Sequence, residues 1–172
     1  KLDHPRGMMS PDLFSQILEQ VGPPLIRLEL YRYGEPLLNP HIVEMIRLAS
    51  SQYHIQTTIS SNLSMPLAAE TAQGLVRAGL DTLVVAADGA DQATYEKYRQ
   101  GGSLAMVLEN LSAIVSVRKA LRSRTPKIIW QYLVFAHNDQ TIGAARQLAA
   151  DRGVDRFIAI EPTVPRYDAH AH

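Results

Sequence analysis

The sequence predicts an α/β fold whose parallel strands form a barrel or part of one. Patterns typical of helix and strand alternate five times along the 172 residues, and this order produces a parallel sheet with right-handed crossovers. The G-x-G-x-x-G loop of dinucleotide-binding sheets is absent. The first expected strand, residues 26–33, places polar side chains on one face, namely Arg27, Glu29, Tyr31 and Tyr33. That face suits a partly wet barrel interior, although an edge strand with one solvated face would show the same pattern.

The first helix is expected over residues 11–21. Ser10 can cap it, Pro11 suits its first position, and Gly22 ends it ahead of two prolines. Its apolar residues fall on one stripe, which consists of Leu13, Phe14, Ile17, Leu18 and Val21. A second helix is expected to begin after the Asn39-Pro40 pair, which serves as its cap.

The remaining elements follow from apolar periodicity and turn residues. Strands are expected over 54–60, 82–87, 127–135 and 156–160, because these segments are β-branched or continuously apolar. Helices are expected over 67–78, 91–100, 103–122 and 138–150, with breaks at Gly79, Gly101-Gly102 and Gly153. Ser103 and Asn138 are expected to cap helices, and Trp130 is expected to face the helices in the core.

Composition limits the possible functions. Basic and acidic residues balance at 17 each, so no net field favours nucleic acid or an anionic membrane. No apolar stretch approaches the roughly 20 residues that span a bilayer, and we expect a cytoplasmic protein. The chain has no cysteine, which excludes disulfides and thiolate metal sites within it. Its length suits one domain, expected over 1–163, with 164–172 as a linker or tail.

Small, polar and helix-starting residues collect where the expected strands end. They form the runs Tyr33-Gly34-Glu35-Pro36-Leu37-Leu38-Asn39-Pro40, Ser60-Ser61-Asn62, Ala87-Asp88-Gly89, Ala136-His137-Asn138 and Glu161-Pro162. The carboxyl ends of parallel strands meet at one edge of a sheet, and ligands bind at that edge in parallel α/β folds. The sequence therefore predicts a binding site there.

Together these junctions resemble the radical S-adenosylmethionine (SAM) enzymes. The likeness lies in Gly34-Glu35-Pro36-Leu37-Leu38, Ser61-Asn62, Ala86-Ala87-Asp88-Gly89, Tyr95-Glu96-Lys97-Tyr98-Arg99, Gly101-Gly102-Ser103, Leu108-Glu109-Asn110-Leu111, Val134-Phe135 with Asn138, and Gly153-Val154-Asp155-Arg156. It covers about Pro11 to Pro162. It is closest to members that carry a C-terminal SPASM-type auxiliary cluster domain and that modify peptides or small metabolites.

The resemblance implies a SAM site at the strand ends. Gly34 would allow the backbone to approach the methionyl amino group, and Pro36 would fix the turn. The cofactor-binding residues that it implies are Tyr33, Gly34, Glu35, Pro36, Ser61, Asn62, Ala86, Asp88 and Gln131; it names no catalytic residue and no metal ligand here. The backbone of residues 135–137 would lie near the adenine. Leu63 departs from the family pattern, because it stands where a glycine is usual.

The resemblance also implies a 4Fe-4S cluster, held by a Cys-x3-Cys-x2-Cys loop that would come just before Asp3 in the family pattern. The expected fold is therefore a partial (β/α)6 TIM-like barrel, with its first strand and cluster loop missing from these residues. In the parent protein, an electron from a donor such as flavodoxin or ferredoxin would cleave SAM to a 5′-deoxyadenosyl radical that takes hydrogen from the substrate. This chain alone would be inactive, and its uncovered edge strand predicts self-association.

Two other functions stay open. The chain could be a cluster-free barrel that acts as a scaffold or partner-binding domain. An aldolase-like barrel would need a Schiff-base lysine on a strand, and Lys127 lies at a strand start, the wrong end for that role. Arg99 is expected to be a surface helix residue, with a place near the cofactor carboxylate as the alternative. Tyr95 and Tyr98 are expected to serve in packing.

Overall fold

Five parallel strands form one sheet in the order β1-β2-β3-β4-β5 in the computed structural model, which describes residues 7–162. They are β1 (Arg27–Glu29), β2 (Gln56–Ser61), β3 (Thr82–Ala86), β4 (Lys127–Leu133) and β5 (Arg156–Ile160). Each strand pairs in parallel with the next one in sequence. This sequential order is that of a barrel wall, whereas a doubly wound sheet reverses direction at a switch point. The predicted α/β fold, a partial barrel of parallel strands, is confirmed.

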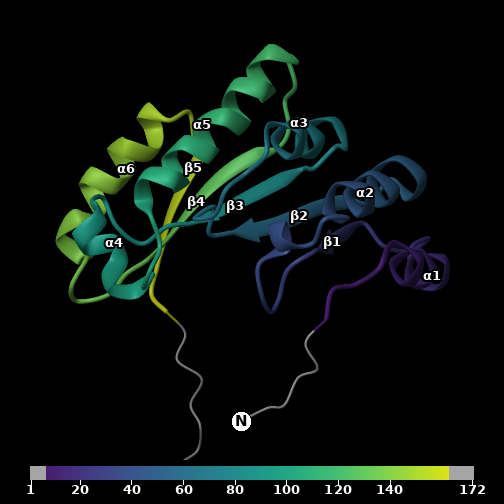
Figure 1. Cartoon of the computed structure of the whole chain (residues 1–172), viewed down its shortest axis with the longest axis horizontal. Coiled ribbons are helices and arrows are strands. Elements are labelled where there is room, and N and C mark those ends of the chain that lie inside the picture. Colours follow the sequence, from purple (N-terminus) through teal and green to yellow (C-terminus); the bar gives the residue numbers. More distant parts are fainter. Residues whose placement is uncertain (1–6, 163–172) are drawn as a thin grey trace, which may run out of the picture.

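Helices connect the strands and cover one side of the sheet. They are α1 (Pro11–Val21), α2 (Ile42–Arg47), α3 (Ala69–Arg77), α4 (Gln92–Tyr98), α5 (Leu104–Ala120) and α6 (Ile142–Asp151), with short turns η1 (Pro36–Leu38), η2 (Leu48–Gln52) and η3 (Asp139–Thr141). Figure 1 shows α2, α3, α5 and α6 on the same side of the sheet. Side chains that alternate away from these helices, such as Thr58, Ser60, Val84 and Gln131, are partly exposed. No helix within residues 7–162 is both long and apolar enough to cross a bilayer.

The main core lies between the sheet and these helices. It includes Ile46 from α2, Ile59 from β2, Leu83 from β3 and Leu111 from α5, all fully buried. Trp130 belongs to it as predicted, and its indole N–H donates to the Ala87 carbonyl at 2.7 Å. A smaller cluster lies under α1 and consists of Phe14, Leu18, Met45, Ala49 and Ile55.

The caps at Ser10 and Ser103 are confirmed, because their hydroxyls accept the N–H groups of Leu13 and Met106 at 3.3 Å each. The cap at Asn138 is wrong. Its side chain makes no cap bond to η3, since both its amide atoms bind elsewhere, as described below. Asn39 lies two residues before His41, the N-cap position of α2, and its side chain accepts the His41 N–H at 2.9 Å.

Two further expectations need correction. The first strand is far shorter than residues 26–33: only Arg27–Glu29 is strand, because the chain turns towards η1 after Leu30 donates to the Thr58 carbonyl. The apolar stripe of α1 is only half covered. Phe14 and Leu18 are buried, while Leu13, Ile17 and Val21 stay exposed. The expected tail, residues 164–172, lies outside the described residues.

At the amino edge of the sheet, where the strands begin, two turns have the same arrangement of residues. Each has a glycine in the left-handed region, Gly79 (φ 82°) and Gly153 (φ 75°), followed two residues later by an aspartate. Asp81 accepts the Thr57 N–H at 2.8 Å, and Asp155 accepts the Ile128 N–H at 2.8 Å. In both turns the carboxylate satisfies a strand N–H on the neighbouring strand, so these acids are structural.

Candidate functional site

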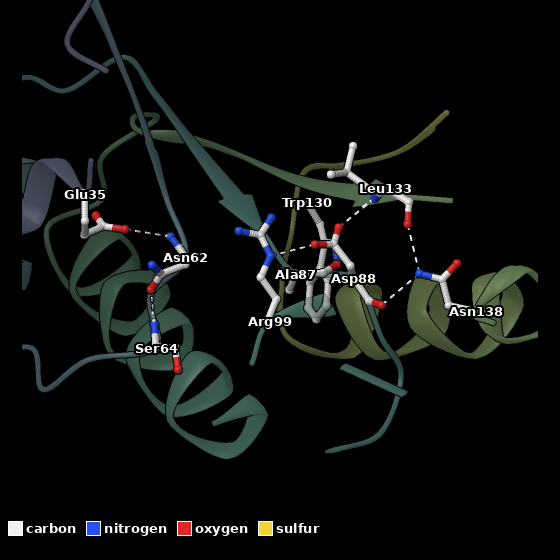
Figure 2. A network of polar contacts seen from close by, with 9 residues as sticks. All are labelled: Glu35, Asn62, Ser64, Ala87, Asp88, Arg99, Trp130, Leu133 and Asn138. Carbon is white, nitrogen blue, oxygen red and sulfur yellow. Dashed lines mark hydrogen bonds and ion pairs between the residues drawn. The ribbon is translucent and has the colours of Figure 1, made fainter. Parts of the chain in front are cut away.

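The turn after β1 is an open stretch of backbone braced by one carboxylate. Gly34 has φ 86°, and apart from Gly34 and its two chain neighbours no atom of residues 7–162 lies within 4 Å of the point where a Cβ would stand, so a ligand could approach its backbone closely. The Glu35 carboxylate accepts from the Leu37 N–H at 3.1 Å and from the Asn62 N–H at 3.0 Å. Figure 2 shows this second bond, which ties the β1 turn to the end of β2.

The turn after β2 adopts the conformation of a glycine without having one. Leu63 has φ 51° and is fully buried, although a leucine rarely occupies the left-handed region. The Ser61 hydroxyl accepts the Leu63 N–H at 3.0 Å, and the Asn62 side chain accepts the Ser64 N–H at 2.8 Å. Asn110 of α5 donates to the Leu63 carbonyl at 2.8 Å. The turn that a glycine would be expected to make is therefore kept, and held by side chains.

A buried ion pair lies at the end of β3. Asp88 is fully buried, and its carboxylate accepts from Arg99 Nε at 2.6 Å and from the Leu133 N–H at 2.7 Å. The Arg99 side chain makes no other hydrogen bond within residues 7–162, and its guanidinium lies over the Tyr98 ring, so its two terminal amino groups have no hydrogen-bond partner there. Figure 2 shows them directed away from Asp88, on the side of Asn62.

Asn138 joins the loops after β3 and β4. Its side-chain amide donates to the carbonyls of Asp88 at 3.0 Å and Leu133 at 2.9 Å, and its oxygen accepts the Phe135 N–H at 2.7 Å. Both N–H groups of the side-chain amide and one lone pair of its oxygen are therefore used, and the side chain is fully buried. Asn138 therefore fixes the position of Asp88, and through it that of Arg99 (Figure 2).

The other predicted site residues lie along the same edge. Ala86 and Gln131 are register partners on β3 and β4; Ala86 is buried, whereas Gln131 is partly exposed. Pro36 begins η1. Tyr33 is 80% exposed at the start of its turn. The structure thus brings Glu35 next to Asn62 and Ala86 next to Gln131, while Asp88 contacts none of them in the bonds described and instead holds Arg99.

Aromatic side chains flank the ion pair. The rings of Tyr98 and Phe135 lie 4.5 Å apart, and Phe135 stacks on His137 at 5.4 Å. Tyr98 therefore packs against the β4 loop, as the packing interpretation requires, yet it remains 46% exposed. In the segment after β1, burial raises the pKa of Tyr31, and the nearby Glu29 carboxylate raises it further.

Arg99 is the residue that sequence reasoning undervalued. It was expected to be a surface helix residue, but its side chain is only 25% exposed and pairs with Asp88. The sequence contains a signal for this pair. Asp88 follows a continuously apolar strand, so its carboxylate is expected to be buried and to require a cationic partner.

Lys127, by contrast, lies exposed at the amino end of β4, which is the wrong edge for an aldolase-like Schiff base.

The arrangement of braced turns at the carboxyl edge can now be compared with known proteins. Residues 3–124 match the family model described as the Radical SAM superfamily. The chain belongs to this superfamily. The resemblance seen in the junction residues is thereby confirmed at the level of the superfamily. No curated protein matches the chain in sequence.

Solved structures of other proteins show a similar fold. The chain resembles Streptococcus suis SuiB bound to precursor peptide SuiA, with a TM-score of 0.73 and 16% identity over 93% of this chain and 34% of SuiB. It resembles methylornithine synthase (PylB) with a TM-score of 0.65 and 15% identity over 93% of this chain and 47% of PylB. A weaker likeness to 2,3-dimethylmalate lyase has a TM-score of 0.50 and 14% identity, over 72% of this chain and 42% of the lyase. The chain thus spans less than half the length of each relative.

The superfamily implies two bound groups, SAM and a 4Fe-4S cluster, and the residues at the carboxyl edge of the sheet fit the first of them. The methionyl end of SAM carries a carboxylate and an ammonium group, and the edge offers the guanidinium of Arg99 for the first and open backbone around Gly34 for the second. A 4Fe-4S cluster needs thiolates, and the chain has no cysteine. Within residues 7–162 no three His, Asp or Glu side chains gather as a metal site either. These residues fit SAM and do not hold the cluster.

Proposed function

We propose that this chain forms the SAM-binding part of a radical SAM enzyme that modifies a peptide or a small metabolite. The observation that carries the proposal is the state of Arg99. Its Nε is fixed by a buried carboxylate at 2.6 Å, while its terminal amino groups have no hydrogen-bond partner among residues 7–162 and point along the carboxyl edge (Figure 2). A half-buried cation held in this way is preorganised for an anionic ligand group.

In this proposal Arg99 binds the methionyl carboxylate, and the backbone carbonyls near Tyr33 and Gly34 accept from the ammonium group. Asn62 and Gln131, which keep polar side chains partly exposed, bind the ribose side. Ala86 supplies a flat surface without a hydrogen bond. These assignments are supported by their common position at one edge of the sheet.

Glu35, Ser61 and Asp88 take a different role in the same site. Their side-chain oxygens already accept N–H groups of neighbouring turns. They therefore act by holding the turns in place, and Pro36 does so by starting η1 after Glu35. Asp88 in addition sets the orientation of Arg99, so its contribution to cofactor binding is indirect.

In this superfamily, SAM bound beside a 4Fe-4S cluster supplies a 5′-deoxyadenosyl radical after one-electron reduction, for which a flavodoxin or ferredoxin would be the electron donor. Because the chain has no cysteine, the proposal requires thiolates from residues outside this sequence. The contribution of the residues described is to bind and orient the cofactor and to limit the access of water. SuiB was crystallised with a precursor peptide, which supports a peptide substrate, and PylB is a methylornithine synthase, which supports a small one. A SPASM-type auxiliary domain and a cytoplasmic location stay predictions.

Titration calorimetry of this chain with SAM tests the binding proposal. Arg99→Ala should weaken binding about tenfold to hundredfold, the usual value of a hydrogen bond to a charged group. Arg118→Lys, at the opposite edge of the sheet, is the matched control and should leave the affinity unchanged. Equal affinity of the Arg99→Ala variant and the unmodified chain would show that the methionyl carboxylate lies elsewhere.

Reconstitution of the parent protein with iron and sulfide under anaerobic conditions tests the enzymatic proposal. A brown protein that cleaves SAM when dithionite is added supports it. A colourless protein that leaves SAM intact would instead favour the cluster-free scaffold, the alternative that agrees with the absence of cysteine from these residues.

A further inference from the structure

A strongly basic segment lies where α5 ends and the chain turns into β4, at the amino edge of the sheet. Four of its side chains are basic and exposed, and together we call them the basic tip: Lys119, Arg122, Arg124 and Lys127. No acidic residue occurs in the sequence between Glu109 and Asp139. Figure 1 shows this end of α5 and the loop to β4 away from α4. The chain as a whole has balanced charge, but this part of its surface is positive.

The protein itself does not use these four cations. Three ion pairs are seen within residues 7–162, and none of them includes a residue of the basic tip. The carboxylate of Asp155 lies at the same edge, but it already accepts from Arg118 and from the Ile128 N–H. The positive charge of the basic tip is therefore not neutralised by the part of the chain that the structure describes.

The backbone at Arg122 indicates that this basic residue does not serve stability. The helix ends at its C-cap, Leu121, and the next residue, Arg122, has φ 51°. Its N–H donates to the Lys119 carbonyl at 3.0 Å, and the Ser123 N–H donates to the Arg118 carbonyl at 3.0 Å. These are the two bonds of a Schellman motif, in which this left-handed position is usually glycine. Arginine is strained there, and the favourable effect of a cation on the helix dipole is limited to the last turn.

The loop that carries the basic tip is held in one conformation. The Ser123 hydroxyl donates to the Thr125 carbonyl at 2.7 Å and accepts the Thr125 N–H at 3.1 Å. The Pro126 carbonyl accepts from Arg118 at 2.8 Å, and the Lys127 N–H donates to the Asp81 carbonyl at 2.7 Å. A partner that binds here pays little entropy for ordering the loop backbone.

The surroundings of the basic tip indicate which kind of anionic partner fits it. Leu121, 39% exposed, is the one large exposed apolar side chain described between residues 104 and 127, whereas a membrane-binding surface needs several. The exposed aromatic rings on which a single nucleic-acid strand would stack, Tyr33 and Tyr98, lie at the carboxyl edge. A duplex site typically makes about six or more phosphate contacts, which is more than this tip offers.

The planar fork of an arginine matches a carboxylate through two parallel hydrogen bonds. We propose that the basic tip binds an acidic segment of a partner polypeptide, whose carboxylates pair with Arg122 and Arg124 and with the flanking Lys119 and Lys127. The tip lies about 20 Å from the carboxyl edge, since β4 has seven residues at about 3.3 Å each. A partner bound there leaves the carboxyl edge open, so this proposal does not depend on SAM binding.

Binding of a fluorescently labelled octaglutamate peptide to the chain, measured by fluorescence anisotropy in 150 mM salt, tests the proposal. The peptide should bind, with an affinity that falls as salt is raised, and octaglutamine should not bind. Arg122→Glu/Arg124→Glu should weaken binding about tenfold or more. Arg32→Glu/Arg47→Glu is the matched control, because it makes the same change of charge at two exposed arginines outside this segment, and it should leave the affinity unchanged.

Arg122→Gly separates binding from folding. Glycine accepts φ 51° without strain, so the midpoint of thermal unfolding should rise, while the affinity for octaglutamate should fall about threefold, as for one exposed ion pair. Three results would overturn the proposal: no octaglutamate binding below about 1 mM, equal losses in the two double variants, or full affinity in Arg122→Gly. Tighter binding of a duplex DNA or of phosphatidylserine vesicles than of octaglutamate would also overturn it, in favour of that partner. All of these measurements are made without SAM, so this proposal and the proposed function fail independently.

Discussion

The sheet has an arginine–aspartate pair at each edge, and the two pairs differ in what they leave available. At the amino edge Arg118 binds Asp155, the Pro126 carbonyl at 2.8 Å and the Gly153 carbonyl at 3.1 Å. At the carboxyl edge the Arg99 side chain makes one hydrogen bond within residues 7–162, to Asp88. Arg118 thus uses three guanidinium N–H groups on protein acceptors, whereas Arg99 uses one. A cation with most of its donors bound to the protein stabilises the fold, whereas a fixed cation with most of its donors unused can bind a ligand.

The backbone does not divide the two edges in this way. Non-glycine residues in the left-handed region occur at both edges, His54 (φ 55°) and Arg122 (φ 51°) at the amino edge and Leu63 (φ 51°) at the carboxyl edge. Leu63 differs from the other two because its side chain is apolar and fully buried. A branched apolar residue in this region is strained, and such strain persists only where surrounding contacts determine it.

The largest expected effect comes from breaking the buried pair. Asp88→Asn should lower the free energy of unfolding by about 3 kcal/mol or more, because it leaves the Arg99 cation without its buried counter-charge. Asp155→Asn should cost less, about 1–2 kcal/mol, because the Asp155 side chain is 33% exposed and Arg118, although only 11% exposed, keeps its bonds to the Pro126 and Gly153 carbonyls. Urea unfolding of both variants measures the difference. Equal losses would mean that the two edges are energetically alike.

Leu63 allows strain and packing to be separated. Leu63→Ala should lower the free energy of unfolding by about 2–5 kcal/mol, because the side chain is fully buried and leaves a cavity. Leu63→Gly creates a slightly larger cavity but accepts φ 51° without strain, and should therefore be about 1 kcal/mol more stable than the alanine variant. A glycine variant less stable than the alanine variant would show that the turn is relaxed.

Lysine substitutions should separate stability from binding. Arg118→Lys loses its fork of bonds to two carbonyls, so the free energy of unfolding should fall by about 1–2 kcal/mol while SAM affinity is unchanged. Arg99→Lys keeps a charge near Asp88 but loses the planar fork, so SAM affinity should fall more than stability does. Unfolding titrations and calorimetry on both variants check this. If both variants lose SAM affinity, Arg99 and Arg118 do not differ in their roles in binding and stability.

The sequence predicted the helix and strand order and the polar turn residues at the carboxyl edge of the sheet, because apolar periodicity and turn residues are local signals. It did not predict the bond from Arg99 to Asp88, which joins residues 11 apart, because the position of Arg99 at the end of α4 depends on how that helix packs. It mistook Asn138 for a helix cap, because Asn is suited to both roles and only the packed loops decide between them. The sequence thus showed which residue types lie in these turns, but their hydrogen-bond partners depend on the tertiary structure.

The carboxyl edge contains one more group without a partner, the hydroxyl of Tyr95. Tyr95 is fully buried beneath Gly89 and Gly102, where a Cβ would stand within 3 Å of it, and its hydroxyl makes no hydrogen bond of acceptable geometry. Burial raises the pKa of Tyr95, and Ser64 nearby only partly offsets the rise. The Tyr132 hydroxyl is also buried with a raised pKa, but it donates to the Asn138 carbonyl at 2.8 Å.

These two tyrosines give the smallest expected effect and a test by pH. At pH 7, Tyr132→Phe should cost about 1 kcal/mol, whereas Tyr95→Phe should cost nothing or stabilise slightly, since it removes an unpaired buried hydroxyl. Above pH of about 10, an unfolded tyrosine loses its proton while the folded one retains it, so stability of the parent falls as pH rises. Tyr95→Phe removes its share of that fall, and its advantage should therefore grow between neutral and alkaline unfolding titrations. If Tyr95→Phe lowers the free energy of unfolding at pH 7 as much as Tyr132→Phe does, the Tyr95 hydroxyl has a hydrogen-bond partner. The carboxyl edge would then have one unsatisfied polar group fewer than we infer.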